Sequence, residues 1–316
     1  MKLDLCRQRR KVWFISSIFV ALSIIGFLYS YFDPSIRSPL KPGLDFTGGT
    51  QIILERQCDL DCNKIDTREI SQQLTNISFP SSNINSLPNL SNSKIQLLDN
   101  SQSLLIRIPF LNAIQTETVI NSLTEAFGPF VKGNISIDAV GPSLGIQLLK
   151  SSLISLFAAF TGIALYISFR YDRTYAFLAL TALFHDIIIV CGLFSWLGII
   201  YKIEVDSLFA VSLLTIAGYS VNNTVVVFDR IREKSRSNKL ITLFEQIDRA
   251  VSATLTRTLY TSATTLFPLI SLMLFGGSTL YWFSVSLSLG VIVGAWSSIA
   301  LAPSLLSKLS TSSNLN

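Results

Sequence analysis

The chain has 316 residues, of which 49% are hydrophobic and only 14% are charged. A soluble domain carries roughly 25% charged residues, so this composition excludes an ordinary soluble protein over the whole length. The formal net charge is +5, but the basic residues cluster beside apolar segments, where they set membrane topology. We therefore expect a lipid bilayer, and no nucleic acid, as the partner of the basic residues.

The first apolar segment, residues 12–32, follows a basic N-terminus, residues 1–11, that holds five lysines and arginines. A helix needs about 20 apolar residues to cross a bilayer core of about 30 Å. The apolar run is too long for the h-region of a signal peptide and lacks a small-residue cleavage site. We predict a retained transmembrane helix.

Residues 33–145 have the composition of a soluble α+β domain. Their patterns predict the order β-α-β-β-α-β, which is the split ferredoxin-like arrangement, with Asp99-Asn100 as the turn of the central hairpin. The expected elements are strand 50–55, helix 66–76, strand 94–98, strand 103–109, helix 113–127 and strand 135–140.

Five further apolar segments complete a predicted six-helix membrane protein, at 146–169, 174–200, 205–228, 253–275 and 279–306. Lysine and arginine gather in the N-terminus, beside residues 170–173 and in loop 229–252, and are scarce in the loops on the other side. Because basic loops stay cytoplasmic, both the N-terminus and the C-terminus, residues 307–316, are predicted in the cytoplasm, and 33–145 outside it.

In loop 229–252, Thr242-x-x-Glu245 resembles a helix capping box. The apolar residues that follow would form one stripe: Leu243, Phe244, Ile247 and Val251. This pattern predicts a short amphipathic helix at the cytoplasmic interface.

The cysteines, Cys6, Cys58, Cys62 and Cys191, form no zinc pattern, and the chain has one histidine; we expect no metal and no cofactor. Cys58 and Cys62 fall in the predicted external domain, where either a disulfide or two free thiols would fit. No nucleophile elbow is present, and no Lys-Ser/Thr follows Gly48-Gly49 as a phosphate-binding loop requires, so the sequence does not favour an enzyme.

Ionisable groups at membrane depth are functional candidates because they are costly. His185 and Asp186 lie about twelve residues into segment 174–200, or ~18 Å deep at ~1.5 Å per residue. There an aspartate costs at least ~2.5–3.5 kcal/mol unless it is paired or hydrated. Two interpretations stay open: a proton or ion path, and a structural hydrogen bond between helices.

Polar residues also lie near the cytoplasmic ends of two other segments. Asn222-Asn223 would bond across helices, and Arg257 would either snorkel to the surface or place a fixed positive charge in the interior. Gly290-x-x-x-Gly294 predicts a seam where another helix approaches closely.

These residues belong to a set of motifs that occur in order along the chain. The predicted external domain opens with Gly43, Asp45, Phe46, Gly48 and Gly49 and closes with Gly141, Pro142 and Gly145. The third apolar segment carries His185-Asp186, and the fifth begins with Arg257. The end of the fourth apolar segment carries the longest motif: Gly218, Tyr219, Asn222, Asn223, Asp229, Arg230, Arg232 and Glu233. Together the motifs resemble the SecF branch of the SecD/SecF family, in the RND superfamily.

The resemblance implies a partner and a role. SecF-type chains pair with SecD in a twelve-helix unit beside the SecYEG channel, with YajC as a further candidate partner, and use a proton or sodium gradient to help pull an unfolded preprotein outward after its insertion by SecA. The implied location is the bacterial cytoplasmic (inner) membrane, and also internal photosynthetic membranes if the host has them.

One position departs from the family pattern. Where this chain has Asn223, the family usually carries an aspartate thought to carry the proton, and Arg257 matches the arginine that faces it. Asparagine cannot titrate, so three accounts stay open: the carboxylate of SecD carries the ion alone, which we favour, Asp186 takes over, or this chain has no relay.

Other functions fit the sequence less well. A non-conducting assembly subunit of the SecD–SecYEG complex is supported by Asn223 but not by His185-Asp186. An RND-type exporter of lipids or small molecules usually has twelve helices and two large loops, which is twice this plan, and an intramembrane enzyme would need a nucleophile–base pair that the apolar segments lack.

Overall fold

The computed structural model describes residues 6–34, 36–57, 65–77, 90, 93–98, 102–237 and 241–313. The chain divides into two compact units, a helical unit of residues 1–42 and 151–316 and a smaller unit of residues 43–150. The Cys58–Cys62 pair and the Asp99-Asn100 turn lie outside the described residues, so both remain predictions.

The smaller unit is one antiparallel sheet with two main helices. Its elements are α2 (Leu44–Thr47), β1 (Gly49–Glu55), α3 (Thr67–Thr75), β2 (Lys94–Leu98), β3 (Ser103–Ile108), α4 (Ala113–Phe127), a short 3-10 turn (Lys132–Asn134) and β4 (Ser136–Val140). The strand order is β2-β3-β1-β4, and every neighbouring pair is antiparallel. Each predicted strand and helix is present, with ends that agree within one residue.

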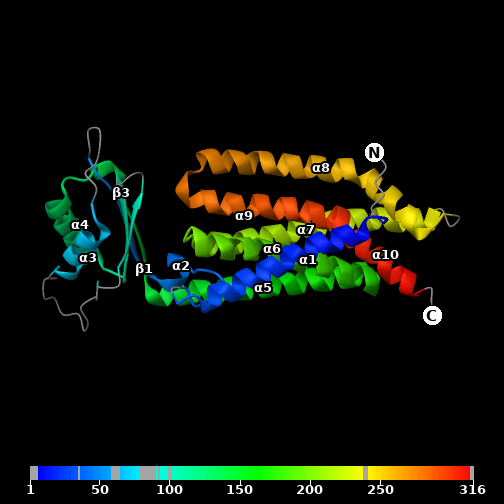
Figure 1. Cartoon of the computed structure of the whole chain (residues 1–316), viewed down its shortest axis with the longest axis horizontal. Coiled ribbons are helices and arrows are strands. Elements are labelled where there is room, and N and C mark those ends of the chain that lie inside the picture. The colour runs from blue at the N-terminus through cyan, green and yellow to red at the C-terminus, as the bar shows by residue number, and fades with distance from the viewer. Residues whose placement is uncertain are drawn as a thin grey trace. The chain divides into compact units, whose positions relative to one another are not determined.

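Alternation along the strands builds the core of this unit. Ile52 and Leu54 on β1 and Leu104 and Ile106 on β3 are at most 1% exposed, as period-two alternation requires for one covered face. They pack in one cluster with apolar residues of α3 and α4, and Figure 1 shows both helices on the same side of the sheet.

The helical unit consists of long apolar helices. Its elements are α1 (Arg9–Phe32), the part of α5 (Pro142–Arg170) from residue 151 onward, α6 (Arg173–Ile200), α7 (Ser207–Ser237), α8 (Leu243–Phe275), α9 (Gly277–Trp296), the π-helical segment η4 (Ser297–Leu301) and α10 (Ala302–Ser313). Within the described part of the chain, six helices are long and apolar enough to cross a membrane, in the order that the sequence predicts.

The loop predicted at 229–252 is largely helical. α7 continues to Ser237, and α8 begins at Leu243 with Thr242 as its N-cap, whose side chain accepts a hydrogen bond from the Glu245 amide. The apolar stripe is not a separate interfacial helix, because it forms the first turns of α8. Ile247 is fully buried in a cluster with residues of α5, α6 and α7, since packing into the bundle buries the stripe more completely than a membrane surface would.

The helices differ in how much of their surface the chain itself covers. In the most apolar stretch of each helix, more than half of the residues are buried in α6, in α7 and in the last span, Leu280–Lys308. The buried share is only 6% in α5 and 11% in α8. The predicted seam is confirmed, because a Cβ added at Gly290 would lie 2.2 Å from the Ile216 side chain of α7. α6, α7 and α9 therefore form the interior, and α5 and α8 present apolar surface to lipid or to another chain.

Candidate functional site

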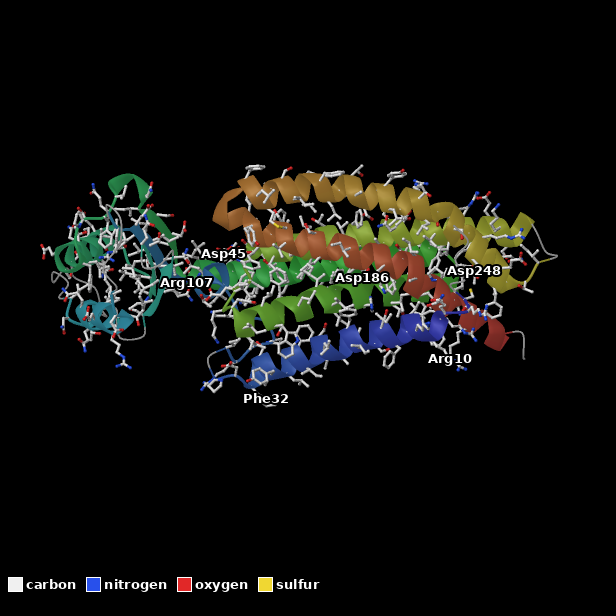
Figure 2. The ribbon with its side chains drawn as sticks, turned by 45° about the horizontal axis from the view of Figure 1, so that its top comes forward. Arg10, Phe32, Asp45, Arg107, Asp186 and Asp248 are labelled. Carbon is white, nitrogen blue, oxygen red and sulfur yellow. The ribbon has the colours of Figure 1, made fainter. Side chains whose placement is uncertain are left out.

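The site is centred on Asp186, in the middle of α6. The side chain is 0% exposed and that of the adjacent His185 is 7% exposed. Figure 2 shows Asp186 between the end of the bundle that carries Arg10 and the end that carries Phe32. The structure therefore places a carboxyl group well inside an apolar helix bundle, where burial is costly unless hydrogen bonds compensate.

Three side chains from three elements contact the carboxylate. His185 Nδ1 lies 2.9 Å from Asp186 Oδ1, Ser220 Oγ of α7 donates to Oδ2 at 2.5 Å, and Ser297 Oγ of η4 donates to Oδ2 at 2.7 Å. Hydrogen bonds to a charged acceptor are stronger than those between neutral groups. The carboxylate thus joins α6, α7 and the last span at one point.

The backbone around Ser297 is adapted to this contact. Ser297 is the first residue of the π-helical segment, and such segments occur often at functional sites. One turn earlier, a Cβ added at Gly294 would lie 3.3 Å from Ser220 Cβ and 3.6 Å from Asp186 Oδ2. A small residue at position 294 therefore lets α9 approach the carboxylate closely.

Some buried polar atoms near these residues have no hydrogen-bond partner. Among the described residues, His185 Nε2, Asn223 Nδ2 and Thr224 Oγ1 are in this state. A buried donor or acceptor left unpaired costs about 1–3 kcal/mol. The imidazole thus has one nitrogen beside the carboxylate and the other without a hydrogen-bond partner among the described residues.

The other intramembrane polar residues are not gathered at Asp186. Asn223 is 5% exposed, whereas Asn222 on α7 and Arg257 on α8 are both exposed. The structure therefore does not place the positive charge of Arg257 in the interior of this chain. Tyr219 bonds α7 to α8, since its hydroxyl donates to Ser262 Oγ at 2.8 Å.

The two glycine-rich motifs at the ends of the smaller unit pack against each other. A Cβ added at Gly145 would lie 2.9 Å from the Gly48 amide nitrogen, and one at Gly48 would lie 2.9 Å from Pro142 Cα. Gly48 and Gly49 have φ values of +69° and +132°, which residues other than glycine rarely adopt. These residues therefore serve close backbone packing between α2, β1 and the start of α5.

The charged residues that end the α7 motif make surface contacts. Arg170 lies 3.7 Å from Asp229, and Arg230 pairs with Glu233 one turn later. These pairs are substantially exposed, so each contributes at most about 1 kcal/mol, and they do not form a buried site.

Sequence reasoning identified His185 and Asp186 but missed both serines that bind the carboxylate. Ser220 lies inside the α7 motif, and Ser297 lies three residues after Gly294. A serine in an apolar helix is common because it can bond its own backbone. Only the packing of α7 and η4 against α6 shows that these two serines face an acid.

The fold and the site define a class: a multi-pass helical membrane protein with a small α+β unit and one acid deep in its bundle. The description "Protein export membrane protein SecD/SecF, C-terminal" matches residues 119–312, and "SecD/SecF GG Motif" matches residues 37–59. The chain belongs to the SecD/SecF family.

Named relatives agree with this assignment. The chain is 56% identical over 303 residues to the protein translocase subunit SecF of Prochlorococcus marinus, covering 96% of this chain and 94% of the relative. It is 38% identical to SecF of Synechocystis over 96% of this chain and 93% of the relative. The crystal structure of SecDF, a translocon-associated membrane protein from Thermus thermophilus, superimposes with a TM-score of 0.77 at 26% identity, over 98% of this chain but 39% of that longer chain.

Proposed function

We propose that this chain is a subunit of the protein-export translocase that acts with a SecD-type partner, and that an ion gradient works on it through His185 and Asp186. Family membership supports the export role. The observation that supports the coupling is the Asp186 carboxylate, fully buried among three hydrogen-bonding side chains from three elements.

Protonation would change the balance of forces at this point. The ionised carboxylate accepts the two serine hydroxyls and the imidazole, whereas the neutral acid needs fewer donors and pays less for burial. Loss of these bonds would release α7 and η4 from α6, which is a two-state device biased by one proton. Asn223 cannot fill this role because an amide does not titrate, so Asp186 is the ion-binding residue that we propose for this chain.

A partner face on α7 and α8 follows from two exposed polar residues. Asn222 and Arg257 are exposed on helices that are apolar enough to cross a membrane. A charge that faces lipid is costly, so Arg257 needs an opposite charge from another chain. A SecD-type partner with an intramembrane carboxylate would supply it, and this account allows that carboxylate to bind the ion together with Asp186.

We propose that the smaller unit is a ferredoxin-like domain, which its strand order and its two main helices support. We assign it to the outer side of the bacterial cytoplasmic membrane, because the basic loops lie at the other ends of the helices. In a chain whose native cysteines are replaced, a membrane-impermeant maleimide should label Ser136→Cys from outside intact cells and should not label Thr242→Cys. The reverse pattern would refute this orientation.

Contacts with SecYEG, YajC, SecA and an unfolded preprotein rest on family membership alone. A second candidate function is a non-conducting assembly subunit, which the Asn223 departure favours. In that case the Asp186 hydrogen bonds would only hold three helices together.

Asp186→Asn separates the two functions. In inverted membrane vesicles that contain the whole complex, we expect export driven by ATP to continue and its stimulation by the proton gradient to be abolished, because asparagine keeps the size of the side chain but cannot exchange a proton. Asp172→Asn, an exposed aspartate at the start of the same helix, is the matched control and should behave as the native chain.

The amount of assembled complex is measured in parallel. If Asp186→Asn lowers the amount of complex and export in the same proportion, the assembly function is correct. If the variant assembles and still responds fully to the gradient, the coupling role of Asp186 is wrong.

A further inference from the structure

Hydrogen bonds attach the segment that follows α1 to neighbouring helices. We define the strap as residues 38–42, which lead from α1 to the first residue of the smaller unit. Ser30 Oγ of α1 donates to the Ser38 carbonyl at 2.8 Å, and Ser195 Oγ of α6 donates to the Pro39 carbonyl at 2.9 Å. The strap is therefore fixed to two helices before it leaves the helical unit.

An almost fully buried ion pair links the strap to the connection between α6 and α7, residues 201–206. Lys41 Nζ lies 3.1 Å from Glu204 Oε1, and these side chains are 9% and 11% exposed. The same ammonium donates to the Lys202 carbonyl at 2.8 Å. The Val205 amide donates to the Lys41 carbonyl at 2.9 Å, and Pro42 pairs with Val205 as a parallel β-bridge.

An ion pair with so little exposure is unusual for a simple loop closure. The attraction between two buried charges is largely offset by the loss of their hydration, so apolar residues of similar size would hold the segment about as well. What a buried pair adds is a specific geometry, because breaking it leaves a charge without compensation. The pair therefore fixes where the strap sits more than it adds stability.

The strap connects the carboxylate site to the chain that enters the smaller unit. Glu204 lies between α6, which carries Asp186, and α7, which carries Ser220. The end of α6 at Ile200 is fourteen residues beyond Asp186, about 21 Å along a rigid helix at ~1.5 Å per residue. At its other end the strap finishes at Pro42, and the next residue opens the smaller unit. A shift of α6 would therefore act on the strap through Ser195 and Glu204.

We propose that the strap transmits rearrangement at Asp186 to the smaller unit, and that Lys41 and Glu204 are the positioning residues that make this connection stiff. The proposal rests on the proposed function, because it needs Asp186 to change state. It adds a route for that change that no contact at the carboxylate itself reveals.

Spin-label distances in the complex with the SecD-type partner test the proposal. One pair reports on the two units relative to each other, Ser136→Cys with Phe177→Cys, and a second pair reports within the helical unit, Phe177→Cys with Leu274→Cys. All of these positions are exposed, and the native cysteines are replaced. Asp186→Asn should shift both distance distributions. Adding Lys41→Met should abolish the shift of the first pair and leave that of the second.

Lys202→Gln is the matched control, because it removes an exposed lysine of the same connection and should leave both shifts unchanged. If Lys41→Met prevents assembly, Lys41→Met combined with Glu204→Leu removes both charges of this ion pair and takes its place, with the same expected result.

Three outcomes overturn the proposal. If the first pair still shifts fully without the ion pair, the strap does not transmit. If Lys202→Gln abolishes the shift as well, the whole connection and not the ion pair is responsible. If Asp186→Asn shifts neither pair in the otherwise native chain, the proposed function fails and the strap proposal fails with it.

Discussion

At the scale of single residues, the two serines on the Asp186 carboxylate carry much of the geometry. A hydrogen bond to a charged group contributes about 1.5–3 kcal/mol. Ser297→Ala should therefore lower the free energy of unfolding of the purified complex by that amount, and with it the melting temperature, because the variant lacks one of the three side chains that bind the carboxylate. Ser288→Ala is the control, because Ser288 is buried on α9 and its hydroxyl has no partner within the described structure.

We expect Ser288→Ala to be neutral or slightly stabilising. Equal melting temperatures for Ser297→Ala and the native complex would show that the Ser297 bond contributes little. Ser220→Ala, alone and combined with Ser297→Ala, would then show whether the two donors replace each other on Oδ2, since neighbouring contacts are not additive.

Cys6 gives a prediction with a pH dependence. Burial raises the pKa of the thiol from 9.0 to about 12, and the neighbouring Asp248 carboxylate acts in the same direction. The thiolate is the reactive form, so a shift of about three units lowers its fraction at neutral pH about thousandfold. Maleimide should label Cys6 far more slowly than a cysteine introduced at the exposed Gln8.

Raising the pH lowers the stability of the folded state through this thiol, whereas it raises the stability through a salt-bridged acid. The unfolded thiol ionises first, so this group costs the folded state stability as the pH rises from 9.0 towards about 12. Rapid labelling of Cys6 at neutral pH in the assembled complex would contradict the burial of the thiol against α8.

At the scale of the helices, the packing of α9 on α7 is the feature most open to a quantitative test. Gly290→Ala places a methyl group 2.2 Å from the Ile216 side chain, and overpacking of this kind costs typically about 1–3 kcal/mol. Gly162→Ala on α5 is the control, because nothing lies within 4 Å of its added Cβ. We expect Gly290→Ala to lower the melting temperature of the complex and Gly162→Ala to leave it unchanged or raise it.

If both glycine variants melt like the native protein, the seam between α7 and α9 is looser than the structure indicates. The seam also bears on function, because Gly294 lies on the same helix beside Asp186 and Ser220. A shift of α9 would move Ser297 away from the carboxylate. We therefore expect Gly290→Ala to reduce gradient-stimulated export as well.

How much the sequence could predict depended on the kind of pattern. Period-two alternation predicted the strands of the smaller unit closely, because they are short and one face of the sheet is covered. The apolar runs predicted the spans but not their ends: the charged residues after Asp229 do not end α7, which continues to Ser237. Helices can extend beyond the membrane, and hydropathy is insensitive to that extension.

The site shows the same division. His185 and Asp186 were predictable because a charge is conspicuous in an apolar run. Ser220 and Ser297 were not, because a serine is neutral in pattern and its partner lies far along the chain. The strap was not predictable either: Lys41 and Glu204 are separated by 163 positions, and nothing in their local sequence marks them as a pair.

At the scale of the whole molecule, the described residues form a helical unit with a buried acid, Asp186, and an α+β unit, which the chain connects through residues 38–42 and through α5. α5 and α8 leave most of their apolar surface uncovered by this chain, so this surface is available to lipid or to a SecD-type partner. We therefore interpret the chain as a subunit that works with a SecD-type partner, with the proposed ion-binding site at Asp186 and the proposed partner face on α7 and α8.

The claim on which this account depends is that Asp186 takes up and releases a proton in the assembled complex. Infrared difference spectroscopy of the complex, recorded over a range of pH, measures this directly. We predict a protonated carboxyl band that grows on acidification and is absent from Asp186→Asn. A native complex without any band that depends on Asp186 over this range would contradict the account.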